Sequence, residues 1–245
     1  MSKLKCLNKM LKSVTEDSGM DGQQLDLIQF NALKSAIAGK NLLITGPAGS
    51  GKSFLIERIV TELKRIGKEP VVTSTTGSSS QLIGGRTVHS YLAIGIGTKP
   101  LEEIIKMIRI RKMKPRYTDI DCLIIDEISM MSGELLNKIE IICRTIRRNN
   151  EPFGGLQIIL VGDFYQLPFI ESEIDKSFCF EHKEFNKWFG KPFKLERIFR
   201  LSSKTAHKDD DESHRIELRN KMWLNILKES RLGSVSKKTM LCLGT

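Results

Sequence analysis

Short runs of apolar residues alternate along the chain with segments in which apolar residues recur every three or four positions. The runs predict buried strands at 41–45, 71–73, 122–125 and 157–161. The periodic segments predict helices at 25–39, 55–66, 101–113 and 132–146. The stretch 75–98 is rich in Ser, Gly and Thr and is predicted to be a loop. Strands that alternate with helices predict an α/β fold whose mostly parallel sheet is flanked by helices.

The polar segments predict how the chain is divided. Residues 1–20 are polar and basic and are expected to form a flexible arm. The strands and helices above lie within 21–201, which is expected to form one lobe. Residues 202–214 are charged and poor in apolar side chains, which is typical of a linker, and 215–245 are expected to form a short helical tail.

Composition adds a large positive net charge. The chain has 245 residues, of which 40% are apolar, so it can bury a core without disulfides or a metal. Lys and Arg number 39 and Asp and Glu number 29, which leaves a net charge of +10. This excess favours a polyanionic partner, nucleic acid first. A basic face for an anionic membrane and plain solubility are the alternatives.

Targeting signals and cysteine usage indicate a compartment. No run of about 18 apolar residues is present, so no membrane-spanning segment and no membrane partner are predicted. The first residues lack the apolar core of a secretory signal. The cysteines are scattered and odd in number, which favours free thiols in an intracellular, reducing compartment, either nucleus or cytoplasm. They are Cys6, Cys122, Cys143, Cys179 and Cys242.

One glycine-rich turn has the pattern G-x-x-x-x-G-K-[ST] and lies between a predicted strand and a predicted helix. In this context glycines let successive N–H groups turn toward a phosphate, and the helix N-terminus adds positive potential. The side chain of Lys52 would reach the β- and γ-phosphates, and the hydroxyl of Ser53 would bind Mg²⁺. The residues assigned to phosphate binding are Gly46, Pro47, Ala48, Gly49, Ser50, Gly51, Lys52 and Ser53.

Two carboxylates follow the predicted strand at 122–125. In open α/β sheets ligands bind at the carboxyl ends of the strands, so Asp126 and Glu127 are expected at the same edge as the phosphate loop. Asp126 would hold Mg²⁺ through its water shell, and Glu127 would orient or deprotonate the attacking water. The alternative is an acidic pair at a helix N-terminus.

Other polar residues allow two interpretations each. Gln166, after the predicted strand at 157–161, could touch a γ-phosphate and lose that contact after hydrolysis, or it could be a solvated turn residue. Two basic clusters could track a phosphate backbone or form solvated faces. One is Lys106, Arg109, Arg111, Lys112, Lys114 and Arg116, and the other is Arg144, Arg147 and Arg148.

Taken together, the motifs resemble those of the Pif-type (petite integration frequency) DNA helicases of superfamily one, from about Leu25 to Gly233. Besides the phosphate loop, the similar segments are 25–29, 74–77 with 83–90, 124–130, 152–155 with 162–168, 195–200 and 227–233. The resemblance implies a P-loop NTPase with a RecA-like lobe that reads adenine through Gln29. It also implies that Arg200 meets the γ-phosphate and that Thr76, Gly77 and His89 contact DNA.

The same resemblance implies an ATP-dependent 5′-to-3′ DNA helicase that uses ATP and Mg²⁺ on single-stranded DNA. Its expected roles are DNA repair, recombination, replication or telomere maintenance. Such helicases carry a second RecA-like lobe, of which the tail at 215–245 would be only the start. We therefore expect slow ATP hydrolysis by this chain alone. A nucleotide-gated DNA-binding module, and a truncated or split gene with the second lobe on another polypeptide, are the alternatives.

Overall fold

The computed structural model describes residues 25–77, 80, 85–95, 99–166, 177–199, 222–226, 228–229, 231, 233 and 236. The expected arm at 1–20 and the expected linker at 202–214 lie outside the described residues. Of the expected tail, residues 222–226 are helical.

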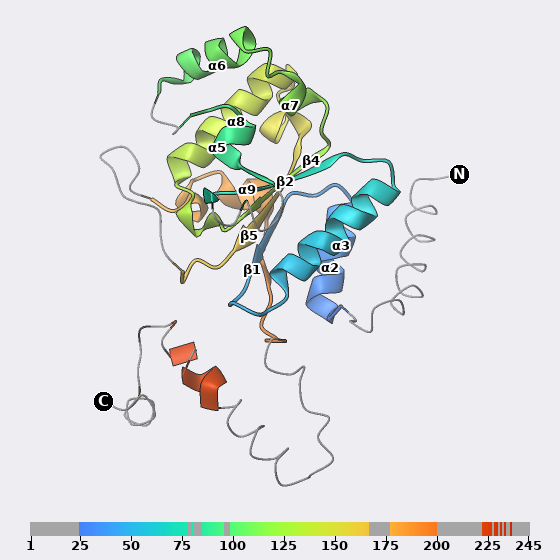
Figure 1. Ribbon diagram of the computed structural model, residues 1–245, viewed down its shortest axis with the longest axis vertical. Coiled ribbons are helices and arrows are strands. Elements are labelled where there is room, and N and C mark those ends of the chain that lie inside the picture. Colours follow the sequence, from blue (N-terminus) through green and yellow to red (C-terminus); the bar gives the residue numbers. More distant parts are fainter. Residues whose placement is uncertain are drawn as a thin grey trace.

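A six-stranded sheet forms the centre of the lobe (Figure 1). Its order is β3-β2-β4-β5-β1-β6, and every pair of neighbouring strands is parallel. The expected mostly parallel α/β sheet is therefore confirmed. The strands are β1 (Leu42–Thr45), β2 (Pro70–Ser74), β3 (Arg86–Thr87), β4 (Cys122–Asp126), β5 (Gln157–Gly162) and β6 (Phe193–Lys194).

Helices cover both faces of this sheet (Figure 1). One face carries α2 (Leu27–Ile37) and α3 (Lys52–Arg65). On the other side lie α5 (Val88–Tyr91), α7 (Pro115–Thr118), α8 (Gly133–Arg147) and α9 (Phe185–Phe189), and α6 (Leu101–Ile110) packs against α8. Three 3₁₀ turns, η1 (Ile128–Met130), η2 (Pro152–Gly155) and η3 (Cys179–Glu181), complete the described elements.

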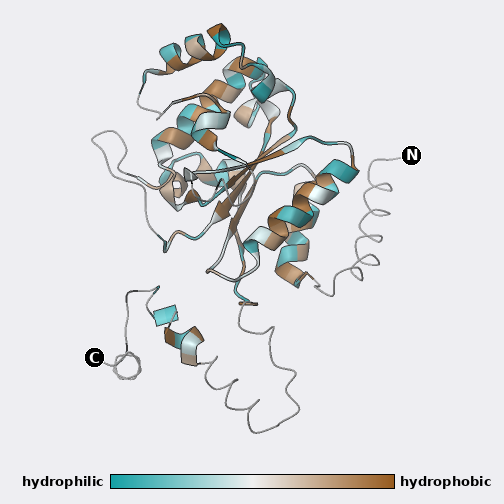
Figure 2. Cartoon of the chain, in the orientation of Figure 1, coloured by the Kyte–Doolittle hydropathy of each residue, from teal (hydrophilic) through white to brown (hydrophobic). Residues whose placement is uncertain are grey.

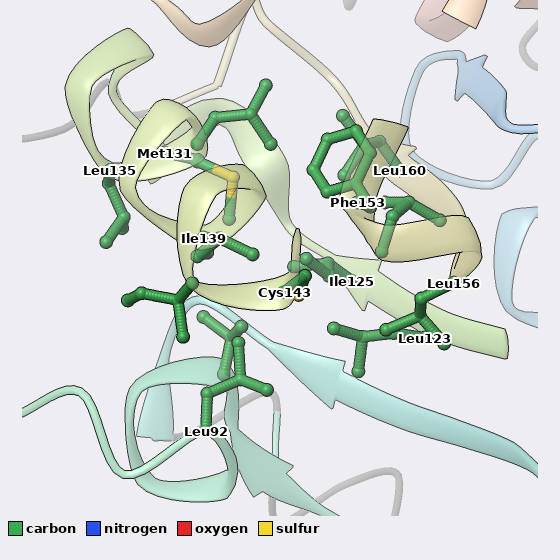
Figure 3. Close-up of a cluster of buried hydrophobic side chains, with 14 of the residues drawn as sticks. Leu92, Leu123, Ile125, Met131, Leu135, Ile139, Cys143, Phe153, Leu156 and Leu160 are labelled. Carbon is green, nitrogen blue, oxygen red and sulfur yellow. The ribbon is translucent and has the colours of Figure 1, made fainter. Parts of the chain in front are cut away.

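Alternation along the central strands builds two cores. In β4, Cys122 and Ile124 pack with α2 and α3, whereas Leu123 and Ile125 pack with α8. The central strands β1, β4 and β5 are accordingly mostly apolar, while the helices show one apolar and one polar side (Figure 2). Figure 3 shows the larger core, where Phe153 lies among residues of α8, β4 and β5. Because both faces of the sheet are packed, the ends of the strands are left for ligands.

The prediction of a loop over 75–98 is wrong in part. Residues 86–87 form β3 beside β2, and residues 88–91 form the one-turn helix α5. The side chain of Thr87 caps this helix by accepting from the N–H of Ser90 at 3.2 Å. A two-residue strand and a four-residue helix are too short to show apolar periodicity, so the sequence pattern could not reveal them.

Three cysteines lie in the described part of the chain, and all are buried with free thiols. Burial raises the pKa of Cys122, Cys143 and Cys179 to about 12 each, so their thiols are unreactive at neutral pH. Among the described residues, no helix has the length and apolar character needed to cross a membrane.

Candidate nucleotide and DNA site

Four polar segments meet at one edge of the sheet because the strands that precede them are parallel. The register pairs Thr45 with Gly162 and Ser74 with Asp126, so the strands end side by side. The phosphate loop follows β1, the segment at 75–77 follows β2, the carboxylate pair ends β4, and Asp163 follows β5. This edge is where ligands bind in open α/β sheets.

The phosphate loop needs glycine at two of its positions. Gly51 has φ +83°, and a Cβ there would lie 2.6 Å from Nε2 of Gln29. A Cβ on Gly46 would lie 2.7 Å from the carbonyl oxygen of Leu195. Among the described residues, the buried Oγ of Ser50 has no hydrogen-bond partner. A cradle that a Cβ would fill, with a spare buried hydroxyl, fits the phosphates of a nucleotide.

Lys52 is the cation of this loop. Its ammonium donates to the carbonyls of Gly46 at 2.8 Å and Pro47 at 3.1 Å, which holds it against the loop. Burial lowers the pKa of Lys52, and the carboxylates of Asp163 and Glu127 oppose that shift. Lys52 therefore lies beside the loop and within the field of the carboxylates, and its contact with nucleotide phosphates stays a prediction.

Asp126 and Glu127 differ in backbone and surroundings. Asp126 is 7% exposed, and its carboxylate accepts from the N–H of Glu127 at 2.8 Å. Burial raises the pKa of Asp126, and burial followed by the charge of Asp126 raises that of Glu127. Glu127 has φ +55°, a left-handed conformation that costs a non-glycine residue on the order of 1 kcal/mol. Glu127 stands at the N-cap of η1, but its side chain makes no capping hydrogen bond to that turn. A strained, partly buried carboxylate at a strand end is typical of a catalytic site.

Ser53 is exposed in the first turn of α3, directly after Lys52. Asp126 ends β4 and lies in the field of Lys52. A serine hydroxyl and a carboxylate are oxygen ligands of the kind that Mg²⁺ prefers. Both residues therefore lie at the edge that carries the phosphate loop, and their role as Mg²⁺ ligands stays a prediction.

The turn after β5 carries Asp163 and Gln166. Asp163 is 2% exposed, and its backbone carbonyl accepts from the N–H of Gln166 at 3.0 Å. Both oxygens of its carboxylate bind the guanidinium of Arg231, at 2.7 and 3.0 Å. Gln166 itself is exposed, so its role at a γ-phosphate stays a prediction. The pairing of Asp163 with Arg231 is a feature that sequence reasoning missed, because the two residues are far apart in the chain.

Two further segments brace the phosphate loop. The Nε2 of the buried Gln29 donates to the carbonyl of Ser50 at 3.3 Å, and its Oε1 accepts from the N–H of Asp26 at 3.0 Å. The N–H of Phe199 donates to the carbonyl of Gly49 at 2.8 Å. Gln29 is thus placed at the loop, and its role in reading adenine stays a prediction. Arg200 lies outside the described residues.

The end of β2 is tied to the carboxylate pair. The N–H of Thr75 donates to the carbonyl of Asp126 at 3.1 Å, and its hydroxyl donates to the carbonyl of Glu127 at 2.5 Å. Thr76 and Gly77 follow at once, half-buried and exposed. Thr75, which directly precedes these candidate DNA-contacting residues, is therefore bonded to both candidate catalytic carboxylate residues.

His89 lies on α5, which α7 holds in place. Arg116 donates to the carbonyls of Ser90 at 2.9 Å and Tyr91 at 2.8 Å, and the hydroxyl of Tyr117 donates to the carbonyl of Leu92 at 2.6 Å. The imidazole of His89 is half-buried, and burial lowers its pKa, so it is neutral at pH 7. This anchoring gives His89 a fixed position beside β2 and β3.

Several arginines of the two basic clusters have structural partners. Arg147 donates to the carbonyls of Gly154 and Tyr117, and Arg144 forms an ion pair with Glu140 at 2.8 Å. Arg116 anchors α5 as described above. These three side chains stabilise the lobe and are poor candidates for tracking a phosphate backbone.

Comparison with known proteins agrees with this geometry. A sequence model of the family described as PIF1-like helicase matches residues 24–240. The ATP-dependent DNA helicase PIF1 of Danio rerio is 41% identical over 184 residues, which cover 75% of this chain and 28% of that protein. The ATP-dependent DNA helicase RRM3 of Saccharomyces cerevisiae is 42% identical over 168 residues, 65% of this chain and 23% of that protein. The chain thus spans about a quarter of the length of these curated relatives.

Solved structures show the same lobe. The crystal structure of the Pif1 helicase from Candida albicans superposes with a TM-score of 0.76 at 35% identity, over 89% of this chain and 46% of that one. Bacteroides Pif1 bound to ssDNA superposes with a TM-score of 0.66 at 25% identity, over 91% of this chain and 49% of that one. Sequence and fold agree, and this chain belongs to the PIF1-like helicase family.

Proposed function

We propose that the chain is the nucleotide-binding, RecA-like lobe of an ATP-dependent 5′-to-3′ DNA helicase that moves along single-stranded DNA. The observation that carries the proposal is the edge of the sheet where the phosphate loop, Asp126 and Glu127 meet, and where Thr75 joins them to the candidate DNA segment. Relatives named as ATP-dependent DNA helicases, and a relative's structure with ADP-AlF3 and ssDNA, support it. DNA repair, recombination, replication or telomere maintenance in a reducing, intracellular compartment would be its setting.

At this site each residue would have a distinct task. Bound ATP supplies the phosphoanhydride whose hydrolysis releases free energy. The phosphate loop and Lys52 would hold the β- and γ-phosphates, and Ser53 and Asp126 would hold Mg²⁺. Glu127 would accept the proton of the attacking water on its carboxylate, for which its raised pKa brings it closer to neutral pH. Gln166 and Arg200 would meet the γ-phosphate.

Single-stranded DNA would lie along Thr76, Gly77 and His89. A second RecA-like lobe, from the same protein or from a second polypeptide, would supply the opposing charge at the phosphates. In P-loop enzymes, an arginine that supplies this charge raises the rate of nucleotide hydrolysis by a factor on the order of 10³ to 10⁵. Fast turnover would therefore need that lobe, whereas nucleotide binding would not.

ATP hydrolysis with and without single-stranded DNA tests the proposal. The assay compares the 245-residue chain alone with the chain plus a second-lobe polypeptide, and a forked duplex reports strand separation. Stimulation by DNA together with unwinding in the complete assembly is the expected result. Stimulation without unwinding would favour a nucleotide-gated DNA-binding module, and the absence of stimulation in both samples would overturn the proposal.

Thr75 offers a test of how DNA reaches the ATP site. Thr75→Val removes the hydroxyl that bonds the carbonyl of Glu127 and should reduce the effect of DNA on nucleotide affinity to below about twofold. Thr75→Ser keeps the hydroxyl and should keep the effect. Titration of a fluorescent ATP analogue, with and without an oligonucleotide, measures it. Thr73→Val is the matched control, because its hydroxyl bonds the carbonyl of Ile124, away from the carboxylates. If the oligonucleotide changes the nucleotide affinity of Thr75→Val as much as that of wild type, the hydroxyl of Thr75 does not connect the DNA and ATP sites.

His89→Ala should weaken binding of single-stranded DNA about fivefold, the value of one hydrogen bond, and leave nucleotide binding unchanged. The half-buried imidazole is neutral and releases no counterion when DNA binds, so its removal should leave the slope of affinity against salt unchanged. Fluorescence anisotropy at several salt concentrations measures both quantities. His182→Ala, at a histidine stacked on Trp188, is the matched control. Loss of nucleotide binding as well would show that His89 is structural.

A further inference from the structure

Asp163 is a buried carboxylate whose partners come from two places in the chain. Its Oδ1 accepts from Nη2 of Arg231 at 2.7 Å and from the N–H of Tyr165 at 3.2 Å. Its Oδ2 accepts from Nε of Arg231 at 3.0 Å. The carboxylate is thus bound by the two parallel donors of one guanidinium and caps the turn that leads to Gln166.

Arg231 lies later in the sequence than all the described site residues discussed above. It follows the helical residues 222–226 and lies 68 positions after Asp163. Its guanidinium also lies over the ring of Tyr165, with 4.5 Å from Cζ to the ring centroid. The side chain of Arg231 is 28% exposed, against 2% for Asp163, so Arg231 lies on the solvent side of the buried carboxylate.

The charge of Asp163 reaches the phosphate loop. The N–H of Gly46 donates to the carbonyl of Gly162, the residue before Asp163, at 3.2 Å, so this turn lies against the phosphate loop. Burial lowers the pKa of Lys52; the negative charge of Asp163 accordingly raises it, and the positive charge of Arg231 lowers it further. An unpaired carboxylate in this buried position would repel the β- and γ-phosphates and attract the ammonium of Lys52 away from them. A paired carboxylate exerts much less of either effect.

We propose that Arg231 is a positioning residue for the nucleotide, which neutralises Asp163 and holds the turn at 163–166 so that Lys52 remains available to the phosphates. Arg231 thereby becomes part of the ATP site. The proposal rests on the proposed function, because it assumes that the phosphate loop binds ATP. Arg231 would act through charge balance rather than through contact with the phosphates.

Charge balance makes a prediction that a purely structural role does not. Arg231→Ala leaves Asp163 unpaired and should weaken binding of ATP-Mg²⁺ by a factor of about ten or more. Adding Asp163→Asn to that variant removes the stranded charge and should restore the affinity to within about threefold of wild type. Arg231→Lys keeps the charge but loses the two-donor geometry, so its affinity should be intermediate.

The measurement is titration of a fluorescent ATP analogue with Mg²⁺ into the 245-residue chain and each variant, with thermal unfolding recorded in parallel. Lys228→Ala, which removes an exposed cation three positions away, is the matched control and should bind as wild type does. Wild-type affinity in Arg231→Ala would overturn the proposal. A double variant that binds no better than Arg231→Ala would also overturn it. Failure of the wild-type chain to bind ATP would instead overturn the proposed function on which it rests.

Discussion

Replacement of Lys52 with alanine should weaken ATP binding on the order of a hundredfold. The ammonium is held against the loop by the carbonyls of Gly46 and Pro47 and is the cation closest in sequence to the cradle. Charge-assisted hydrogen bonds of an ammonium to phosphate contribute about 1.5–3 kcal/mol each, and about 2.7 kcal/mol corresponds to a hundredfold change. Equilibrium titration of a fluorescent ATP analogue measures the change directly.

The control for Lys52 lies on the same helix. Lys64 is exposed in the last turn of α3, so Lys64→Ala removes an equal charge at a distance from the loop and should bind ATP normally. Because burial already disfavours the charged form of Lys52, Lys52→Ala should fold as stably as wild type. Unchanged affinity in Lys52→Ala would mean that this loop does not bind the nucleotide phosphates.

Glu127→Gln should leave ATP bound and lower turnover by a factor of about 10² to 10⁴, the usual contribution of a general base. The amide has the size of the carboxyl but cannot accept the proton of the attacking water. Single-turnover phosphate release, in the assembly that hydrolyses ATP, measures the loss, and titration measures the retained affinity. Glu134→Gln, at a half-exposed residue paired with Lys138 on α8, is the matched control.

The raised pKa of Glu127 adds a pH dependence. A base must be deprotonated, so turnover should fall as the pH drops through a value above that of a free glutamate. The raised pKa means that the folded state favours the protonated form of Glu127. Its ionised carboxylate therefore lowers the free energy of unfolding at pH values above the unfolded pKa of about 4.3. At pH 7 Glu127→Gln should therefore unfold at a temperature no lower than wild type. Normal turnover in this variant would show that another group is the base.

Sequence pattern predicted the parts of the site that depend on local chemistry. The strand-turn-helix around 46–53 and the strand that ends at Asp126 carry strong apolar and glycine signals, and both appear where expected. Parallel pairing then brings them to one edge of the sheet without further information.

The sequence pattern could not predict features that depend on contacts between residues far apart in the chain. The one-turn helix α5 is held by Arg116 and Tyr117, so its position depends on tertiary contacts that have no periodic signal. The same holds for Asp163, whose partner Arg231 lies beyond a charged segment in the sequence. Arg116 itself carried two interpretations, and only its contacts with backbone carbonyls decide between them.

The central claim is that one lobe couples nucleotide binding to single-stranded DNA through the edge of its sheet. The most direct measurement is the affinity of the 245-residue chain for a labelled oligonucleotide, without nucleotide and with a non-hydrolysable ATP analogue and Mg²⁺. We predict that the analogue changes the affinity by at least about threefold and that Lys52→Ala abolishes the change. DNA binding that is absent, or equal in both conditions, would contradict the account.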